Sequence, residues 1–215
     1  MIYYSKVGIL LLWSSICSLF PVGKRRFPIS TLGYALLSLL ARKPRSGYDL
    51  AQYMKQPIGY FWHARQSQIY AELTELEAQG WITHQVIEQH ARPDKKLYTI
   101  TEEGRVALCQ WVADPVEIKP DRNELALKAY TIWLAEPEQA LYLFRTQQDF
   151  HAKKLAHYED ILLRLEQQHG SQWRIDEPLF GDYATLQLGI GYERMYEAWC
   201  RWMAEQLEQH LLHPE

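Results

Sequence analysis

The spacing of apolar residues changes twice between residues 29 and 113, and this change limits the folds that the 215-residue chain can adopt. In residues 29–43 and 66–79, apolar side chains recur three and four positions apart, which is the spacing of one face of an α-helix. Residues 82–88 and 96–100 are instead rich in β-branched and aromatic side chains, which favours two short strands. The stripe that we expect to be buried on the helix before the strands is Ile69, Leu73 and Leu76. The segment therefore predicts helices on both sides of a β-hairpin.

Capping signals divide this segment further. Ser46 and Asp49, three positions apart, predict a capping box at the start of a short helix. Gly80 is expected to end the helix before the hairpin, because glycine adopts the left-handed conformation without steric cost. Thr101, followed by two glutamates, predicts the N-terminus of another helix. The order helix, helix, helix, hairpin, helix is typical of a winged helix-turn-helix.

The sequence beyond residue 121 indicates helices throughout. We expect one helix over residues 123–135, a second from Pro137 to about residue 168, and a third over residues 180–212. Apolar and aromatic residues alternate at spacings of four and three along both long helices, as in a coiled coil. These seams are His151, Leu155, Tyr158, Leu162 and Leu165 on the first, and Leu188, Tyr192, Met195, Trp199 and Trp202 on the second. Because two such helices are too small a piece to form a rounded core alone, they predict a homodimer.

The expected fold class is therefore mainly α with a small β-hairpin wing: a winged helix-turn-helix followed by a long-helix dimerisation domain. We expect residues 29–114 to form the winged helix-turn-helix domain and residues 121–213 the helical dimerisation and effector domain. A short hinge that begins and ends near a proline separates them. Residues 1–28 are expected to be an extension outside both domains.

Residues 7–20 of this extension form an apolar run. At about 1.5 Å per residue, a helix of that length falls short of a hydrocarbon core of about 30 Å. The run lacks the small-residue cleavage site of a signal peptide, and the cations at residues 24–26 follow it on the side that opposes export. We therefore expect no membrane partner, with a membrane tether as the alternative.

Charge is distributed unevenly along the chain. Residues 24–114 carry 12 Lys and Arg against 9 Asp and Glu, whereas residues 115–215 carry 10 against 17. This difference indicates that the front half meets an anionic partner. The three cysteines are far apart and match no metal or disulfide pattern, which is consistent with a cytoplasmic protein. The sequence contains no nucleophile elbow, phosphate loop or His–Cys ligand spacing, so we expect no enzyme activity, no cofactor and no metal.

Several motifs resemble those of the PadR family of transcriptional regulators. They are LGYALL at residues 32–37, SGYDL at 46–50, SQIY at 67–70 and KLYTIT at 96–101. Phe61 and Trp62, together with the helical C-terminal part, resemble the longer PadR subfamily that includes virulence activators. The resemblance implies a homodimer whose third helices enter successive major grooves of double-stranded DNA, with C-terminal helices that clasp the partner subunit. It also implies an effector near the dimer interface, a phenolic acid or a planar toxic compound in some relatives.

Candidate DNA contacts lie on the face of the helix at residues 66–79 that is opposite its buried stripe. At about 100° per residue, this face carries small and hydroxyl side chains that allow close approach to base edges. Cations beside the helix and in the hairpin, and tyrosine hydroxyls, can reach phosphates. A face that is merely solvated is the alternative. The candidates are Tyr48, Arg65, Ser67, Gln68, Tyr70, Ala71, Thr74, Arg92, Lys95 and Lys96.

Aromatic residues of the C-terminal half allow two interpretations, core packing or the wall of a ligand pocket. Polar groups beside them suit a flat aromatic acid, whose carboxylate an arginine can pair with. The effector-binding candidates are His151, Tyr192, Arg194 and Trp199.

Together these features predict a homodimeric transcriptional repressor that binds a pseudo-palindromic operator and is released by a small aromatic effector. The alternative is a winged-helix module that binds a protein or is tethered to a membrane and takes no effector.

Overall fold

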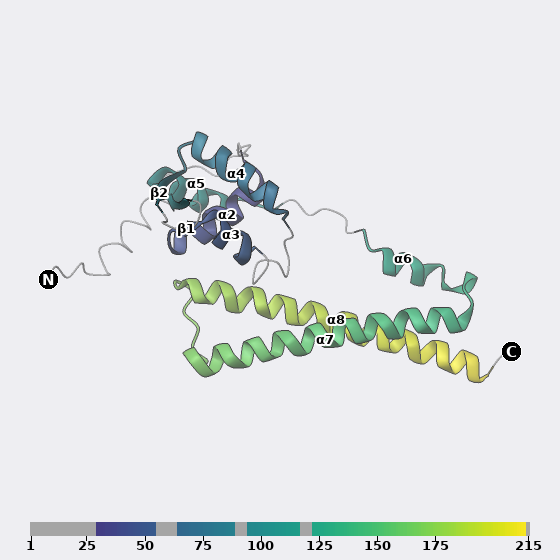
Figure 1. The fold of residues 1–215 in the computed structure, drawn as a ribbon. Coiled ribbons are helices and arrows are strands. Elements are labelled where there is room, and N and C mark those ends of the chain that lie inside the picture. Colours follow the sequence, from purple (N-terminus) through teal and green to yellow (C-terminus); the bar gives the residue numbers. More distant parts are fainter. Residues whose placement is uncertain (1–28, 55–63, 89–93, 117–121, 214–215) are drawn as a thin grey trace. The chain divides into compact units, whose positions relative to one another are not determined.

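The computed structural model describes residues 29–54, 64–88, 94–116 and 122–213. The chain divides into two compact units, Met1–Ile118 and Lys119–Glu215. Most described residues are helical, and the strands form a small antiparallel sheet in the first unit (Figure 1). The predicted fold class, mainly α with a small β wing, is confirmed.

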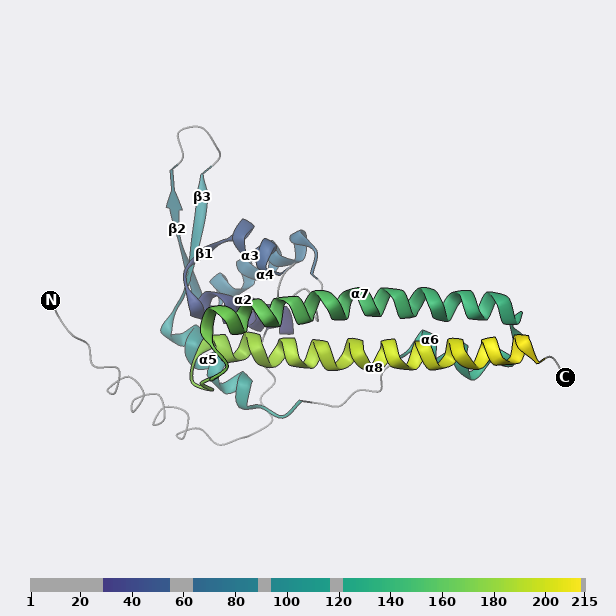
Figure 2. The ribbon, with the colours of Figure 1, turned by 90° about the horizontal axis from the view of Figure 1, so that it is seen from below.

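The described part of the N-terminal unit contains four helices and three strands. In chain order they are α2 (Thr31–Arg42), β1 (Arg45–Ser46), α3 (Gly47–Tyr53), α4 (Gln66–Ala78), β2 (Ile82–Ile87), β3 (Lys95–Ile100) and α5 (Glu102–Ala113). β3 lies between β1 and β2 and pairs antiparallel with both. The sequence did not indicate β1, because a strand of two residues has no periodicity. β2 and β3 extend beyond the helices as a wing (Figure 2).

The predicted caps are present. Asp49 N donates to Ser46 Oγ at 3.1 Å, and Ser46 N donates to Asp49 Oδ2 at 3.2 Å, which completes the capping box of α3. Gly104 N donates to Thr101 Oγ1 at 3.1 Å at the start of α5. Gly80 follows α4 with a φ of 72°, a conformation that glycine adopts without strain.

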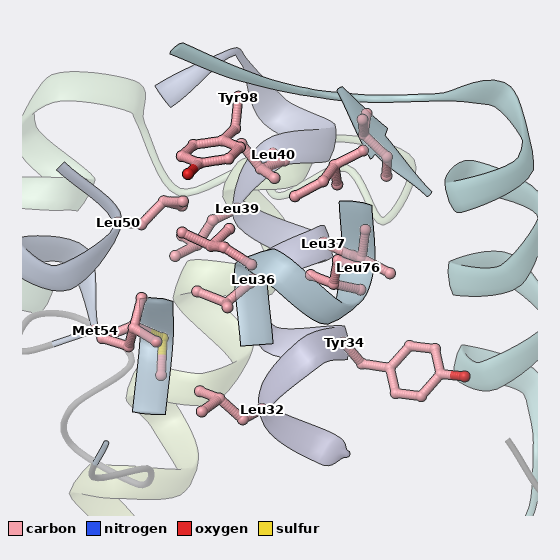
Figure 3. Close-up of a cluster of buried hydrophobic side chains, with 14 of the residues drawn as sticks. Leu32, Tyr34, Leu36, Leu37, Leu39, Leu40, Leu50, Met54, Leu76 and Tyr98 are labelled. Atoms are coloured by element: carbon pink, nitrogen blue, oxygen red, sulfur yellow. The ribbon is translucent and has the colours of Figure 1, made fainter. Parts of the chain in front are cut away.

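The core of this unit forms around α2. Leucines of α2 pack with Leu50 and Met54 of α3 and Tyr98 of β3, as Figure 3 shows. From α4, the predicted stripe of Ile69, Leu73 and Leu76 is fully buried. Because each such side chain contributes about 1.5–3 kcal/mol when buried, this stripe fixes which face of α4 remains exposed.

Tyr34 of α2 lies on the side of the core that faces α5. Its ring stacks on Trp111 with centroids 4.7 Å apart. Burial raises the pKa of Tyr34 to about 12. The phenol therefore stays neutral and serves to dock α5 against the three-helix core.

The C-terminal unit is an antiparallel pair of long helices preceded by a short one. Its elements are α6 (Glu124–Tyr130), the 3₁₀ turn η2 (Ile132–Leu134), α7 (Pro137–His169) and α8 (Pro178–Leu212). α7 and α8 lie side by side along their whole length in both ribbon views (Figures 1 and 2). Phe144 of α7 and Cys200 of α8 are fully buried between them.

The two predicted seams have different environments. His151 and Tyr158 of the α7 seam are buried in the pair. The buried residues of α8, however, are Leu186, Ile190, Glu193, Tyr196, Cys200, Met203 and Ala204. The predicted α8 seam is instead largely exposed: Leu188 by 72%, Met195 by 58% and Trp202 by 52%. The prediction therefore found a real apolar stripe on α8, but a second stripe that includes a glutamate faces α7.

The prediction of a single helix over residues 123–135 is wrong. α6 ends at Tyr130, and Thr131 Oγ1 donates back to the Leu127 carbonyl at 3.1 Å. Pro137 disfavours helical backbone in the residue before it, so the chain must leave the helix before α7 begins. Trp133, in the turn that follows, is 78% exposed.

Candidate nucleic-acid interface

The outward face of α4 consists mostly of small side chains, with one carboxylate, that of Glu75, beside them. Ser67, Ala71 and Thr74 are exposed and lie opposite the buried stripe. Glu72 and Glu77 lie toward the flanks of α4, where Glu77 contacts His84 Nδ1 of β2 and Glu72 lies beside Gly33 of α2. Glu75 is exposed one turn after Ala71, and its Oε1 accepts from Gln79 Nε2 at 2.8 Å. Small neutral side chains over a firmly buried stripe allow another surface to approach this helix closely.

Hydrogen bonds within α4 decide which atoms this surface offers. Thr74 Oγ1 donates to the Tyr70 carbonyl at 3.1 Å, so the methyl group and the oxygen lone pair of Thr74 remain for an outside partner. Arg65 N donates to Gln68 Oε1 at 2.9 Å, which leaves the amide nitrogen of Gln68 as its outward donor. The sequence did not reveal these internal bonds.

Two tyrosines border the α4 face. Tyr48 of α3 is 62% exposed, and Tyr70 of α4 is 41% exposed. A Cβ at Gly47 would lie 2.6 Å from Tyr70 Cε1, so glycine lets the start of α3 lie against this ring without a shift of the tyrosine. This close approach joins the N-terminus of α3 and the outward face of α4 in one surface.

The cations predicted to reach DNA have different environments. Arg65, immediately before α4, and Lys96, in β3, are exposed. Lys95 Nζ lies 3.2 Å from Asp49 Oδ2 and forms an ion pair with it. Arg92 lies outside the described residues. The described candidates all lie in the N-terminal unit: Tyr48, Arg65, Ser67, Gln68, Tyr70, Ala71, Thr74, Lys95 and Lys96.

The effector candidate His151 belongs to a buried charged cluster between α7 and α8. His151 Nδ1 lies 2.5 Å from Glu193 Oε2, and Lys154 Nζ lies 2.5 Å from Glu193 Oε1. Only 3% of the Glu193 side chain is exposed. The ring of Tyr196 stacks on His151 with centroids 4.8 Å apart, and its hydroxyl accepts from Asn123 Nδ2.

Tyr196 connects three of the four effector candidates. Besides His151, it contacts Tyr192 and Trp199, with ring centroids 4.7 and 6.1 Å away. Sequence reasoning missed Tyr196 because it does not lie on the predicted α8 seam. Arg194 lies elsewhere, where its guanidinium donates to Glu159 Oε1 at 2.7 Å. An open hollow of this unit, between α6 and the start of α7, is lined by none of the four candidates.

The described residues form neither a metal site nor a membrane-spanning helix. They contain no group of three His, Cys, Asp or Glu side chains placed to hold a metal ion. Within the described ranges, no helix combines the length and the apolar character needed to span a bilayer. The apolar run at residues 7–20 lies outside these ranges.

A three-helix core with a sheet wing and an exposed third helix defines the N-terminal unit as a winged helix-turn-helix. The family model "Transcriptional regulator PadR-like family" matches residues 36–110, and the model "Virulence activator alpha C-term" matches residues 122–208. The chain is 35% identical over 173 residues to the negative transcriptional regulator PadR of Bacillus subtilis, an alignment that covers 78% of this chain and 92% of that protein. The chain therefore belongs to the PadR-like family of transcriptional regulators, as its motifs implied.

Solved structures agree with this assignment. B. subtilis PadR in complex with operator DNA has a TM-score of 0.74 at 32% identity, covering 83% of this chain and 99% of that one. The same protein in complex with p-coumaric acid has a TM-score of 0.69 with the same identity and coverage. The Vibrio cholerae virulence activator AphA, at 24% identity, shares the fold with a TM-score of 0.65 over 83% of this chain and 99% of that one.

Proposed function

We propose that the protein is a homodimeric transcriptional repressor, and not an enzyme, that binds a pseudo-palindromic operator through α4 and the wing. The observation that carries this proposal is the set of small exposed side chains on α4, Ser67, Ala71 and Thr74, in a unit that also exposes the cations Arg65 and Lys96. Small side chains suit contact with base edges, and flanking cations suit phosphates. The operator complex of B. subtilis PadR, and the description of that protein as a negative regulator, support the proposal.

Operator binding is tested by footprinting the purified protein on the DNA upstream of its own gene. We expect two protected half-sites about 10 bp apart, because the two α4 helices of a dimer enter successive major grooves. Thr74→Ala should change the base preference at one position in each half-site, because it removes the methyl group. Glu103→Gln, at an exposed position in the first turn of α5, is the control and should leave the preference unchanged. Protection that ignores sequence would contradict specific operator binding.

Dimerisation is proposed to use the exposed apolar stripe of α8. Leu188, Met195 and Trp202 are each more than half exposed. They project from the face of α8 that α7 does not cover, and the adjoining α6–η2 segment exposes Tyr130, Trp133 and Leu134. Exposed apolar surface of this extent marks an interaction site. In a symmetric dimer, the α8 stripe of each subunit is buried against the other subunit.

We further propose that a small aromatic acid binds beside His151, Tyr196, Tyr192 and Trp199. Glu193 fixes Nδ1 of His151, which leaves Nε2 to meet a hydroxyl or carboxylate of the ligand. The p-coumaric acid complex of B. subtilis PadR supports this ligand class. The ligand can release DNA only if it binds the DNA-free arrangement of the dimer more tightly than the DNA-bound one.

Tryptophan fluorescence tests the ligand site. Titration with p-coumaric acid should give saturable quenching that weakens when operator DNA is present. His151→Gln should abolish the response, whereas His210→Gln, at an exposed position near the end of α8, should not. Identical titrations for both variants would remove His151 from the site.

A further inference from the structure

The two adjacent lysines of the wing have different roles in the structure. Side chains alternate along β3, so Lys96 lies on the same face as Tyr98 and Ile100, which are buried in the core with α4. Lys96 is exposed and lies opposite Val86 of β2. Lys95 lies on the other face of the strand and reaches Asp49 of α3, with 3.2 Å between Nζ and Oδ2.

Asp49 is held in place by Ser46 as well as by Lys95. Its Oδ2 accepts from Ser46 Oγ at 2.7 Å and from Ser46 N at 3.2 Å. The hydrogen bond from the Ser46 side chain, with a smaller contribution from Lys95, lowers the pKa of the Asp49 carboxyl. The carboxylate is therefore ionised at neutral pH, and 39% of the Asp49 side chain is exposed to solvent.

This carboxylate lies where a negative charge opposes DNA binding. Asp49 follows Tyr48, a proposed phosphate contact, in the first turn of α3, and Gly47 of the same turn lies against Tyr70 of α4. An unpaired carboxylate on this surface would repel phosphates, and the ammonium of Lys95 cancels that charge. Because Asp49 already balances the charge of Lys95, this ammonium gains less from a phosphate than the exposed Lys96 does.

We propose that Lys95 pairs with Asp49 and not with a DNA phosphate, so that Asp49 is a positioning residue that braces the wing against α3, and Lys96 is the lysine of the two that contacts DNA. This inference rests on the proposed DNA-binding function. It revises the sequence prediction that both lysines reach the backbone, because the sequence showed two adjacent cations and not the partner of either.

The salt dependence of operator binding by the full chain distinguishes the two lysines. Lys96→Met should reduce the slope of log K against log salt by about 0.9, the value for one lost phosphate contact. The double variant Asp49→Asn with Lys95→Met removes a neutral pair and should keep the wild-type slope. Its affinity should be within about 2-fold of wild type, whereas Lys95→Met alone should bind several-fold more weakly. A double variant with a slope lower by about 0.9 would overturn the proposal. Wild-type protein that binds no DNA would refute the proposed function. The contact between Lys95 and Asp49 would then be tested by hydrogen exchange alone.

Hydrogen exchange of the free protein tests the brace without DNA. Lys95→Met should accelerate exchange of the β3 amides that pair with β1, whereas Lys96→Met should leave them unchanged. Lys95→Met also leaves the capping box of α3 intact, so its effect does not depend on how well asparagine replaces Asp49. Equal protection in both variants would overturn the bracing role of Asp49.

Discussion

Cys200 and Glu193, four and three residues from Tyr196 on α8, show how burial governs single side chains in the two-helix unit. Cys200 is fully buried beside Phe144, and burial raises the pKa of its thiol to about 11. Glu193 is just as deeply buried, but His151 and Lys154 occupy its two oxygens. A carboxyl group in such a place requires polar partners, because an unsatisfied buried polar group is unfavourable.

Cys200 should react slowly with alkylating reagents. At pH 8, a pKa of about 11 leaves about one thiol in a thousand as the reactive thiolate, compared with about one in four for an unperturbed thiol. We expect alkylation at least about 100-fold slower than that of a free thiol, with the rate rising up to pH 11. Mass spectrometry of folded protein measures the rate, and urea-unfolded protein is the control. A rate equal to that of unfolded protein would show that Cys200 is not buried.

Glu193→Gln should destabilise the C-terminal unit by about 1–3 kcal/mol. Glutamine preserves the shape and can still accept from His151, but it cannot balance the charge of Lys154. Urea unfolding followed by circular dichroism measures the change in the free energy of unfolding. Glu205→Gln, at an exposed position of α8, is the matched control and should change it by less than about 0.5 kcal/mol. Equal losses in both variants would contradict the cluster.

At the scale of elements, the junction between β2 and α5 depends on one close approach. The carbonyl of Trp81, next to β2, accepts from Thr101 N at 3.0 Å. Gly104, in the first turn of α5, lies so near that a Cβ there would be 2.2 Å from the same oxygen. The contact holds the start of α5 against the base of the wing and orients the hairpin relative to the helices.

Gly104→Ala should therefore destabilise the N-terminal unit by about 1–3 kcal/mol, because the methyl group meets backbone that cannot move without breaking the Thr101 bond. Gly191→Ala is the control, because a Cβ there has no atom within 4 Å and alanine stabilises a helix by about 0.5–1 kcal/mol relative to glycine. Thermal unfolding should show a lower Tm for the first variant and an unchanged or higher Tm for the second. A Gly104→Ala protein as stable as wild type would refute the close approach.

At the scale of the whole molecule, the two units have different requirements. The N-terminal unit buries its leucines around α2 and has its own core. The C-terminal unit leaves an apolar stripe exposed along α8 and aromatic residues exposed around η2. The free energy of unfolding of that unit should therefore depend on protein concentration, because in the proposed dimer a second copy covers this surface.

Leu188→Glu with Met195→Glu should convert the proposed dimer to a monomer, because two charges would be buried in its apolar seam. Sedimentation velocity measures the mass, and operator affinity should fall at the same time because a monomer contacts one half-site. Gln187→Glu, exposed and turned away from the seam on α8, is the control and should remain dimeric. A double variant that stays dimeric would place the interface on another surface.

The sequence by itself determined the elements whose signals are local. Ser46 with Asp49, Thr101 and Gly80 fixed helix ends, and the Ile69, Leu73 and Leu76 stripe fixed the buried face of α4. Each of these depends on residues at most a few positions apart, where backbone geometry leaves few alternatives. The motifs that implied the family lie in the same segment.

Tertiary structure alone decided which of two stripes on α8 faces α7, because both carry apolar or aromatic residues and only packing distinguishes them. It also placed Tyr196 between three of the effector candidates, and it paired Arg194 with Glu159, away from them. Finally, it gave Lys95 a partner in Asp49, far away in sequence, and left Lys96 exposed. Such pairings depend on how separate elements pack, and no local spacing in the sequence encodes them.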